Sequence, residues 1–202
     1  MKPTVYDFDK TLTYHDTLLG FYCHATPRTL FYHAKRLLYL GAIVATKLKL
    51  IDNDRFKVIG IILFLRGQSR ETLQQKGVEY AGTLRTNNLY TSLMENHSEE
   101  VWIVSASFEE YLVPLFGRER LLATRIAYDR DGNAAGLEFN CYKEEKRKAL
   151  IERGVEQIGL FYTDHYSDLP VAEMSDTICL VDGDSIKECH SVEHFKAACG
   201  KS

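Results

Sequence analysis

Cysteine is scarce in this sequence of 202 residues, and its placement excludes two classes of protein. The cysteines are odd in number and none forms a C-x-x-C pair; they are Cys23, Cys141, Cys179, Cys189 and Cys199. A disulfide framework and a structural zinc site both need cysteines in matched sets. We therefore expect reduced thiols and a cytoplasmic protein. The first apolar segment begins within a few residues of Met1, so we also expect no signal peptide.

Long hydrophobic runs and a strong net charge are also missing. The most apolar stretches, 37–46 and 58–65, fall short of the roughly 18 to 20 residues that a membrane-spanning helix needs. A formal net charge of −3 excludes a chain built to coat nucleic acid. Hydrophobic residues make up 45% of the chain, which is enough for one large domain or a core with an inserted lobe.

The positive charge that is present gathers in one segment. Residues 28–70 hold nine Lys or Arg residues but only two acids, Asp52 and Asp54, whereas the rest of the chain is acidic. The same segment contains both apolar stretches. We predict that it is an inserted helical hairpin over 27–67, which turns at 51–54, where the sequence reads IDND.

Outside this segment, strand-like and helix-like stretches alternate. Short apolar runs that are typical of strands buried on both faces lie at 3–8, 101–105, 121–124, 160–163 and 177–181. Helical patterns lie at 14–25, 69–83, 88–96, 107–116, 143–153, 168–174 and 185–199, and 129–136 reads as a hairpin turn. This order predicts an α/β fold, doubly wound around a parallel five-stranded Rossmann-like sheet, with an inserted α-helical lobe after the first strand.

The stretch VYDFDKTLT, residues 5–13, places two acids at the end of the first predicted strand. Asp7 and Asp9 face the same side, roughly 7 Å apart at about 3.3 Å rise per residue. Two like charges so close are costly to bury unless a cation lies between them. Sites in α/β sheets lie at the carboxyl ends of strands. The same rule brings four further side chains to this edge: Ser105, Lys146, Asp164 and Asp168.

Carboxylate oxygens in this arrangement suit a hard divalent cation, most simply Mg²⁺. A cation, carboxylates, a hydroxyl and an ammonium around one point are the groups that phosphoryl transfer uses, because positioning and charge neutralisation do most of that catalysis. The residues alone therefore predict an enzyme that handles a phosphate group.

Four motifs, in this order, resemble those of the haloacid dehalogenase-like phosphatases. DFDKTLT (7–13) is similar to their first motif, D-x-D-x-T-L, and VWIVSAS (101–107) is similar to their second. Lys146 is similar to the lysine of their third motif, and YTDHYSDLP (162–170) to their acidic fourth. Within the superfamily the chain resembles the phosphoserine-phosphatase-like branch, subfamily IB, and looks most like phosphatidylglycerophosphatase C-type hydrolases.

The resemblance implies roles for the acids. Asp7 would attack phosphorus and become a transient aspartyl phosphate. Asp9 would protonate the leaving alcohol and then activate the water that hydrolyses the intermediate. Asp7, the backbone carbonyl of Asp9 and Asp164 would hold Mg²⁺.

It also implies roles for the groups around the phosphate. Ser105, at the start of a helix, would bind a phosphate oxygen together with backbone N–H groups such as that of Ala106. Lys146 would neutralise the phosphate and the nucleophile. Asp168 would orient Lys146 or a metal-bound water.

The resemblance further divides the chain and shows where it departs from the pattern. Residues 1–13 and 68–202 would form the core, and residues 14–67 the inserted cap. Lys10 and Lys143 stand where the family usually has glycine, and His165 replaces a common serine. Lys10 and His165 would lie beside the site, where either could alter substrate fit or the pH optimum.

Two other functional classes remain open. A phosphoacceptor receiver domain also gathers acids and a lysine at strand ends, but it needs no second acid like Asp9 and no cap. A membrane-surface binding module could use the basic hairpin over a degenerate core, although the four motifs are intact.

The substrate is predicted from the insertion. Its apolar and basic residues favour an amphiphilic phosphomonoester of the phosphatidylglycerophosphate kind, with phosphoserine or another small soluble phosphomonoester as the alternative. Under the first reading, residues 27–67 would contact an anionic membrane, and the protein would be peripheral at the inner membrane surface.

Overall fold

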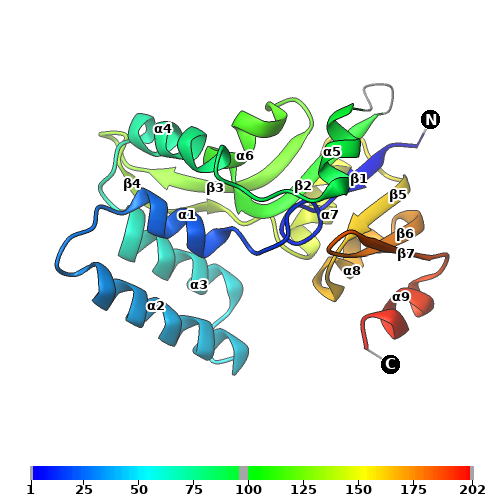
Figure 1. The fold of residues 1–202 in the computed structure, drawn as a ribbon, viewed down its shortest axis with the longest axis horizontal. Coiled ribbons are helices and arrows are strands. Elements are labelled where there is room, and N and C mark those ends of the chain that lie inside the picture. The colour runs from blue at the N-terminus through cyan, green and yellow to red at the C-terminus, as the bar shows by residue number, and fades with distance from the viewer. Residues whose placement is uncertain (1, 96–99, 201–202) are drawn as a thin grey trace.

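The computed structural model describes residues 2–95 and 100–200, and a mixed β-sheet forms their framework (Figure 1). The strands follow the order β4-β3-β2-β1-β5-β6-β7. The five that run parallel are β3 (Leu121–Tyr128), β2 (Val101–Phe108), β1 (Thr4–Tyr6), β5 (Ile158–Thr163) and β6 (Ser175–Asp182). These are the five strands that the sequence predicts. Because β1 lies at the centre, its carboxyl end falls in the middle of one sheet edge.

The prediction of a five-stranded sheet is wrong, because the described residues form a sheet of seven strands. β4 (Ala134–Phe139) pairs antiparallel with β3, and β7 (Ser185–Cys189) pairs antiparallel with β6. The hairpin turn that was expected at 129–136 is shorter, because β4 already begins at Ala134; β4 forms one edge of the sheet. The parallel part of the sheet is thus flanked on both sides by a hairpin partner.

The helix predicted over 185–199 is wrong in its first part. Gly183 and Asp184 form a two-residue turn between the paired residues Asp182 and Ser185, and φ of Gly183 is +60°. Glycine at the first central position of such a turn favours a tight hairpin. The chain therefore returns as the edge strand β7 before the short helix α9 (Val192–Ala198) begins.

Helices cover both faces of the sheet (Figure 1). α4 (Arg70–Ala81), α5 (Asn88–Glu95) and α6 (Glu109–Phe116) pack on one face. α7 (Glu144–Glu152), α8 (Leu169–Ala172), which follows a 3₁₀ turn at Tyr166–Asp168, and α9 pack on the other. Adjacent residues of β1 point to opposite cores: Val5 packs with the second set and Tyr6 with the first. Residue 96, predicted as the last of its helix, lies outside the described residues.

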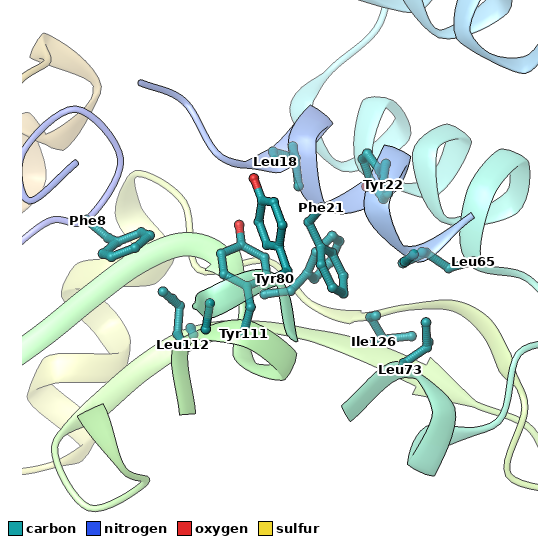
Figure 2. Close-up of a cluster of buried hydrophobic side chains, with 14 of the residues drawn as sticks. Phe8, Leu18, Phe21, Tyr22, Leu65, Leu73, Tyr80, Tyr111, Leu112 and Ile126 are labelled. Carbon is teal, nitrogen blue, oxygen red and sulfur yellow. The ribbon is translucent and has the colours of Figure 1, made fainter. Parts of the chain in front are cut away.

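One of the two cores joins the sheet to the first helix of the insertion (Figure 2). Phe21 of α1 (Leu18–Ala25) packs on Tyr111 of α6 with ring centroids 4.8 Å apart, and both side chains are buried. Tyr80 donates a hydrogen bond of 2.7 Å to the carbonyl of Thr17, the residue before α1. Burying side chains of this size stabilises the fold by about 1.5–3 kcal/mol each. The start of α1 is therefore held at the sheet edge.

The predicted helical hairpin is present in the insertion. α2 (Tyr32–Lys47) and α3 (Asn53–Gly60) lie side by side, and α3 continues into a π-helical turn at Ile61–Leu65. The loop between the two helices ends at Asp52. The carboxylate of Asp52 caps α3, because it accepts a hydrogen bond from the N–H of Arg55 at 2.8 Å. None of the helices in the described ranges is long and apolar enough to cross a membrane.

Candidate active site

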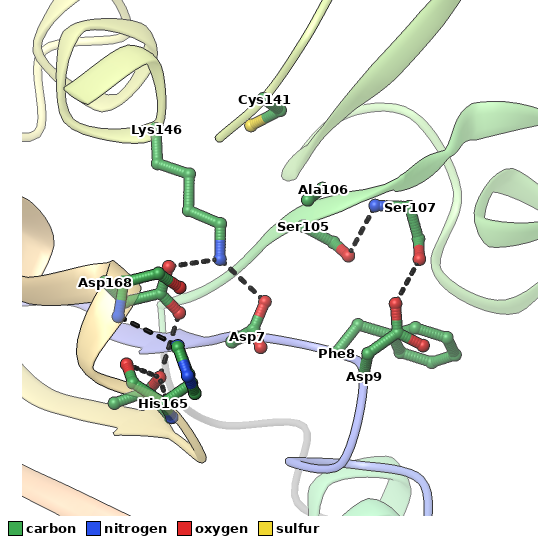
Figure 3. Close-up of polar contacts among 12 residues, drawn as sticks. Asp7, Phe8, Asp9, Ser105, Ala106, Ser107, Cys141, Lys146, His165 and Asp168 are labelled. Carbon is green, nitrogen blue, oxygen red and sulfur yellow. Dashed lines mark hydrogen bonds and ion pairs between the residues drawn. The ribbon is translucent and has the colours of Figure 1, made fainter. Parts of the chain in front are cut away.

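Asp7, Lys146 and Asp168 form a buried ion-pair triad at the carboxyl end of β1 (Figure 3). Nζ of Lys146 lies 2.7 Å from Oδ1 of Asp7 and 2.8 Å from Oδ1 of Asp168. Each of the three side chains is at most 9% exposed. The structure therefore brings together three of the side chains that the sequence places at this edge, and the ammonium of Lys146 offsets the charge of Asp7.

Each member of the triad is held by its surroundings. The N–H of Asp7 donates to the carbonyl of Tyr162 at 2.9 Å, which fixes the end of β1 beside β5. The hydroxyl of Thr163 donates to Oδ2 of Asp168 at 2.9 Å. Both oxygens of Asp168 are thus engaged, whereas the second oxygen of Asp7 accepts no side-chain hydrogen bond from a described residue.

The charges of the triad act on one another. Burial raises the pKa of Asp7 to about 8, although the ammonium of Lys146 acts to lower it. Burial also opposes the charge of Lys146, but the carboxylates of Asp168 and Asp7 outweigh it and raise the pKa of this lysine. Two carboxylates and one ammonium leave a net negative charge when all are ionised. A further cation at this point would favour the ionised form of Asp7.

Asp9 has its own set of partners. Its Oδ1 accepts the N–H of Thr17 at 2.8 Å and the hydroxyl of Thr17 at 2.6 Å, and its Oδ2 accepts the hydroxyl of Ser107 at 2.5 Å (Figure 3). Burial raises the pKa of Asp9 to about 6, the carboxylate of Asp16 adds to this effect, and the hydrogen bonds oppose it. A carboxyl group with this pKa can both give and take a proton near neutrality.

Ser105 lies inside β2 and not at the start of a helix, which corrects the prediction. β2 continues to Phe108, beyond the apolar run that ends at Val104, and α6 begins at Glu109. The pairing of β2 with β3 shifts register between Val104 and Phe108, so residues 105–107 form a bulge. Within it the N–H of Ser107 donates to Oγ of Ser105 at 3.0 Å. The hydroxyl hydrogen of Ser105 can then be donated to another acceptor.

The acids line a cleft of about 260 Å³ that the sheet edge and the insertion share. Its lining includes Asp7, Asp9, Ala106, Ser107, Lys146, Asp164 and Asp168. Ser105 is buried and does not itself form part of the lining. Burial raises the pKa of Asp164 to about 6, with the carboxylate of Asp168 adding to the effect.

The donor set of this cleft fits a divalent cation. The second oxygen of Asp7 and the carboxylate of Asp164 accept no side-chain hydrogen bonds from described residues, and both are hard ligands. A cation here would rely on these two carboxylates, because in the described part of the chain no group of three or more His, Cys, Asp or Glu side chains could hold a metal ion. Two carboxylates and the carbonyl of Asp9 leave positions for water and phosphate oxygens, which Mg²⁺ usually keeps in its shell.

The two lysines that replace glycine have backbone conformations that glycine favours. φ is +58° at Lys10 and +51° at Lys143. Lys143 combines this φ with a ψ of −119°, which is typical of glycine in a tight turn. The family's preference for glycine at these positions therefore has a physical reason, and the chain retains strained residues beside Asp9 and ahead of Lys146.

Sequence reasoning missed Thr17 and Ser107, which donate hydrogen bonds to Asp9, and Lys57, which lines the cleft. Lys57 is only 2% exposed, and burial lowers its pKa to about 7. In the sequence, Lys57 looks like one more solvent-exposed lysine, because it lies in a basic segment. Its spacing was the available signal, because a residue four positions before the buried Ile61 lies on the same face of the helix.

Fold and site together define an α/β enzyme with acids at the carboxyl end of its central parallel strand. Residues 4–173 match the haloacid dehalogenase-like hydrolase family, and because the match covers most of the chain, the protein belongs to that family. The prediction of a haloacid dehalogenase-type hydrolase is thereby confirmed. No curated protein is similar enough to the chain to count as a match.

Solved structures share the fold at low sequence identity. A protein of unknown function from Bordetella pertussis Tohama I has a TM-score of 0.70 at 19% identity, and the alignment covers 85% of each chain. A phosphoserine phosphohydrolase-like protein from Francisella tularensis has a TM-score of 0.63 at 18% identity, over 88% of this chain and 86% of that one. A phosphoserine phosphatase, solved as a phospho-aspartyl intermediate analogue, has a TM-score of 0.58 at 15% identity, over 88% and 84%. The narrower resemblance to phosphatidylglycerophosphatase C-type hydrolases stays a prediction.

Proposed function

We propose that this protein is a Mg²⁺-dependent phosphatase that hydrolyses a phosphomonoester through an aspartyl phosphate on Asp7. The observation that carries the proposal is the difference between the two acids of the DFD motif. Asp7 is paired with the ammonium of Lys146, whereas Asp9 is held by hydroxyl and N–H donors. Covalent catalysis uses one acid as nucleophile beside a cation and a second acid that exchanges a proton. Membership of the hydrolase family supports the same chemistry.

In the first half-reaction an oxygen of Asp7 attacks phosphorus, and the bond between phosphorus and the leaving oxygen breaks. Lys146 offsets the negative charge that the nucleophile and the phosphoryl group bring together. Asp9 gives its proton to the leaving oxygen, so the products are an aspartyl phosphate and a neutral alcohol. A pKa of about 6 leaves Asp9 acidic enough to donate and basic enough to recover a proton.

In the second half-reaction Asp9, now a carboxylate, takes a proton from the water that attacks phosphorus. The acyl-phosphate bond breaks, which restores the carboxylate of Asp7 and releases inorganic phosphate. The hydroxyl of Ser105 and the N–H of Ala106 bind the non-bridging oxygens in both steps, and Asp168 keeps Lys146 oriented. Thr17 and Ser107 hold Asp9 in one place while its proton leaves and returns.

Asp7, the carbonyl of Asp9 and Asp164 would hold Mg²⁺ in this cleft. When bound, the ion supplies charge neutralisation for the phosphate and for the carboxylate of Asp7. Burial raises the pKa of Asp7, and a bound cation would lower it and so favour the carboxylate that attacks phosphorus. This effect is the physical reason to expect a strict metal requirement.

Residues 14–67 serve as the cap in this proposal, and the substrate is amphiphilic. Apolar side chains of α2 are exposed: Leu37 by 71%, Leu38 by 63% and Val44 by 55%. The other apolar stretch, 58–65, buries Ile61, Phe64 and Leu65 in the core. Packing of the cap on the core therefore accounts for the second stretch and for Tyr39 and Ala42 of the first, but not for the exposed side chains of α2. Exposed apolar side chains that gather on one helix indicate contact with a partner or a membrane surface.

Basic residues flank the exposed apolar side chains of α2. Lys35 and Arg36 precede them, and Lys47 and Lys49 follow. A Lys or Arg near an anionic leaflet contributes about 1 kcal/mol, so four contribute roughly 4 kcal/mol. Apolar residues between positive charges fit the headgroup region of an anionic membrane. A phosphomonoester of the phosphatidylglycerophosphate kind is the substrate that such a surface would reach.

Phosphoserine is the alternative substrate, and it is favoured by the fold shared with phosphoserine phosphatase. A phosphoserine site needs a free cationic donor for the carboxylate of the substrate. Among the described residues, Lys57 is the cation that the hairpin contributes to the cleft. Its three donors are used on Ala106, Thr124 and Asn140. This occupancy argues for the amphiphilic substrate.

Hydrolysis of p-nitrophenyl phosphate, measured with Mg²⁺ and in excess EDTA, tests the proposed reaction. We expect release of phosphate with Mg²⁺ and none in EDTA. A panel of phosphoserine, sugar phosphates and phosphatidylglycerophosphate then tests the substrate, and kcat/KM should be highest for the lipid phosphate. A stable phospho-aspartate without turnover would indicate a receiver domain instead. Binding to liposomes without any hydrolysis would indicate a membrane-binding module.

Co-sedimentation with liposomes rich in phosphatidylglycerol tests the membrane contact. Binding should weaken steeply with salt, because exposed charges are screened within about 10 Å at 0.1 M. Replacing Leu37, Leu38 and Val44 by Gln should abolish binding and lower activity on the lipid phosphate, while activity on p-nitrophenyl phosphate is unchanged. Replacing the exposed Ile151 and Ile186 by Gln is the matched control and should change neither. Equal losses on both substrates would make a small soluble phosphomonoester the substrate.

A further inference from the structure

Lys57 is a buried cation whose three donors are all used on neutral oxygens. Its ammonium donates to the carbonyl of Ala106, to the hydroxyl of Thr124 at 2.9 Å and to Oδ1 of Asn140 at 2.5 Å. No carboxylate of a described residue forms an ion pair with it. A buried ammonium without a counter-ion is costly, so the arrangement of its neighbours needs a reason.

The carbonyl that Lys57 contacts belongs to the peptide between Ala106 and Ser107. The N–H of that same peptide donates to Oγ of Ser105 at 3.0 Å. The hydroxyl of Thr124 donates to the same carbonyl at 2.8 Å. Because a peptide is planar, holding its C=O also sets the direction of its N–H, and through it the hydroxyl of Ser105.

The side chain that follows this peptide extends the connection to the second acid. The hydroxyl of Ser107 donates to Asp9 (Figure 3). The Ala106–Ser107 peptide therefore adjoins two groups of the proposed site. One is the hydroxyl of Ser105, which would bind the phosphate, and the other is Ser107, which supports Asp9. A rotation of the peptide plane would disturb both.

The other part of the network belongs to the insertion. Asn140, in the connection between β4 and α7, accepts from Lys57 and donates to Oδ1 of Asn53 at 2.9 Å and to Oδ1 of Asp54 at 2.5 Å. Asn53 and Asp54 form the first turn of α3, and Lys57 lies one turn further along. α3 is thus joined to the core at two successive turns, both beside the cleft.

From this network we infer that Lys57 is a positioning residue that links the seating of α3 to the shape of the phosphate-binding bulge. With α3 on the core, Lys57 holds the Ala106–Ser107 peptide, and through the N–H of Ser107 it holds the hydroxyl of Ser105 where it can receive a phosphate. Lys57 itself has no donor left for the substrate. The inference rests on the proposed phosphatase function, since it concerns the groups that would bind the phosphoryl group.

Inorganic phosphate is the probe for this proposal, used as an inhibitor of p-nitrophenyl phosphate hydrolysis. Lys57→Met keeps an unbranched apolar stem and removes the three donors. We expect the inhibition constant of phosphate to rise at least about tenfold and kcat to fall by a similar factor, as loss of hydrogen bonds from a charged group implies. The Mg²⁺ concentration for half-maximal activity should change less than about twofold, because Lys57 contacts neither Asp7 nor Asp164.

Lys76→Met is the matched control. Nζ of Lys76 donates to the carbonyl of Ala25 at 2.5 Å and to Oε1 of Gln68 at 2.6 Å, so it also ties α1 to the core but does not line the cleft. This variant should keep the inhibition constant of phosphate within about twofold of wild type. Equal effects of the two substitutions would overturn the proposal, because they would reflect a general loosening of the insertion.

Thr124→Val decides the question if Lys57→Met does not fold. It keeps Lys57 and removes the hydroxyl that shares the carbonyl of Ala106. A smaller rise in the inhibition constant of phosphate, with an unchanged Mg²⁺ requirement, supports the proposal. Wild-type inhibition by phosphate in a folded Lys57→Met or Thr124→Val protein overturns it. If the wild-type protein neither hydrolyses p-nitrophenyl phosphate nor binds phosphate, the proposed function itself fails, and this inference with it.

Discussion

The hydroxyl of Ser107 donates a hydrogen bond of 2.5 Å to Oδ2 of Asp9. Together with the two hydrogen bonds from Thr17 to the other oxygen, it fixes the carboxyl group that exchanges protons in the proposed reaction. Ser107 lies two residues after Ser105 in the same strand, so one short segment supplies the phosphate hydroxyl and the support of the acid.

Ser107→Ala should lower kcat on p-nitrophenyl phosphate by about 10- to 100-fold, a part of the 10²–10⁴ that general acid–base catalysis contributes. KM should change little, because the hydroxyl contacts Asp9 and not the substrate. Ser175→Ala is the control, since its hydroxyl donates to the carbonyl of Val171 at 3.1 Å, away from the cleft. Wild-type kcat in Ser107→Ala would mean that Thr17 alone positions Asp9.

The stability of the metal-free protein should depend on pH through Asp9. Burial raises the pKa of this carboxyl from 3.8 to about 6, so the folded state binds its proton more tightly than the unfolded state. Its contribution to the free energy of unfolding therefore falls as pH rises from about 4 to about 6 and is constant above that range. Thermal melts in EDTA should show the Tm of Asp9→Asn gaining on wild type over this window. Parallel Tm curves for the two proteins would contradict the raised pKa.

Lys143→Gly should stabilise the protein. A side chain at φ +51° and ψ −119° is strained, and glycine relieves that strain at a smaller entropic cost. We expect a gain of about 1 kcal/mol, which corresponds to roughly 2–4 °C in Tm for a chain of this size. Glu144→Gly, at the first residue of α7, is the opposite control and should lower Tm. A lower Tm for Lys143→Gly would show that the lysine side chain makes a compensating contact.

Removal of the metal should silence the enzyme. EDTA should abolish hydrolysis of p-nitrophenyl phosphate, and added Mg²⁺ should restore it. Asp164→Ala should raise the Mg²⁺ concentration for half-maximal activity at least about tenfold, because it removes one of two carboxylate ligands. Ca²⁺ should inhibit, since it prefers a larger and looser oxygen shell. Full activity of wild type in excess chelator would rule out the roles given to Asp7 and Asp164 as ligands.

The parallel strands could be predicted because each is a short apolar run, and the position of Asp7 at a strand end followed from that pattern. The edge strand β7 could not be recognised by its apolar content, because four of its five residues are exposed. Its signal was the Gly183-Asp184 pair, which is a hairpin turn in a context that also reads as the start of a helix. Ser105 was placed at the end of its strand and the start of a helix, because the apolar run stops there. The strand instead continues through a bulge, which the apolar pattern does not reveal.

The partners of Lys57 show what a local pattern leaves out. Its ammonium contacts residues 49, 67 and 83 positions away in the chain. Periodicity is read over windows of about 11–18 residues, so it can assign Lys57 to a buried helix face but cannot say what it meets there. Only the docking of α3 on the bulge of β2 brings these groups together.

The most direct test of the proposed mechanism is to trap the covalent intermediate on Asp7. Hydroxylamine, present during turnover of p-nitrophenyl phosphate with Mg²⁺, converts an aspartyl phosphate into a hydroxamate that accumulates whatever the lifetime of the intermediate. Peptide mass spectrometry should find the hydroxamate at Asp7, only with substrate and Mg²⁺ together, and not in Asp7→Asn. An unmodified Asp7 after many turnovers in hydroxylamine, or a hydroxamate at another acid, would contradict the assignment of Asp7 as the nucleophile.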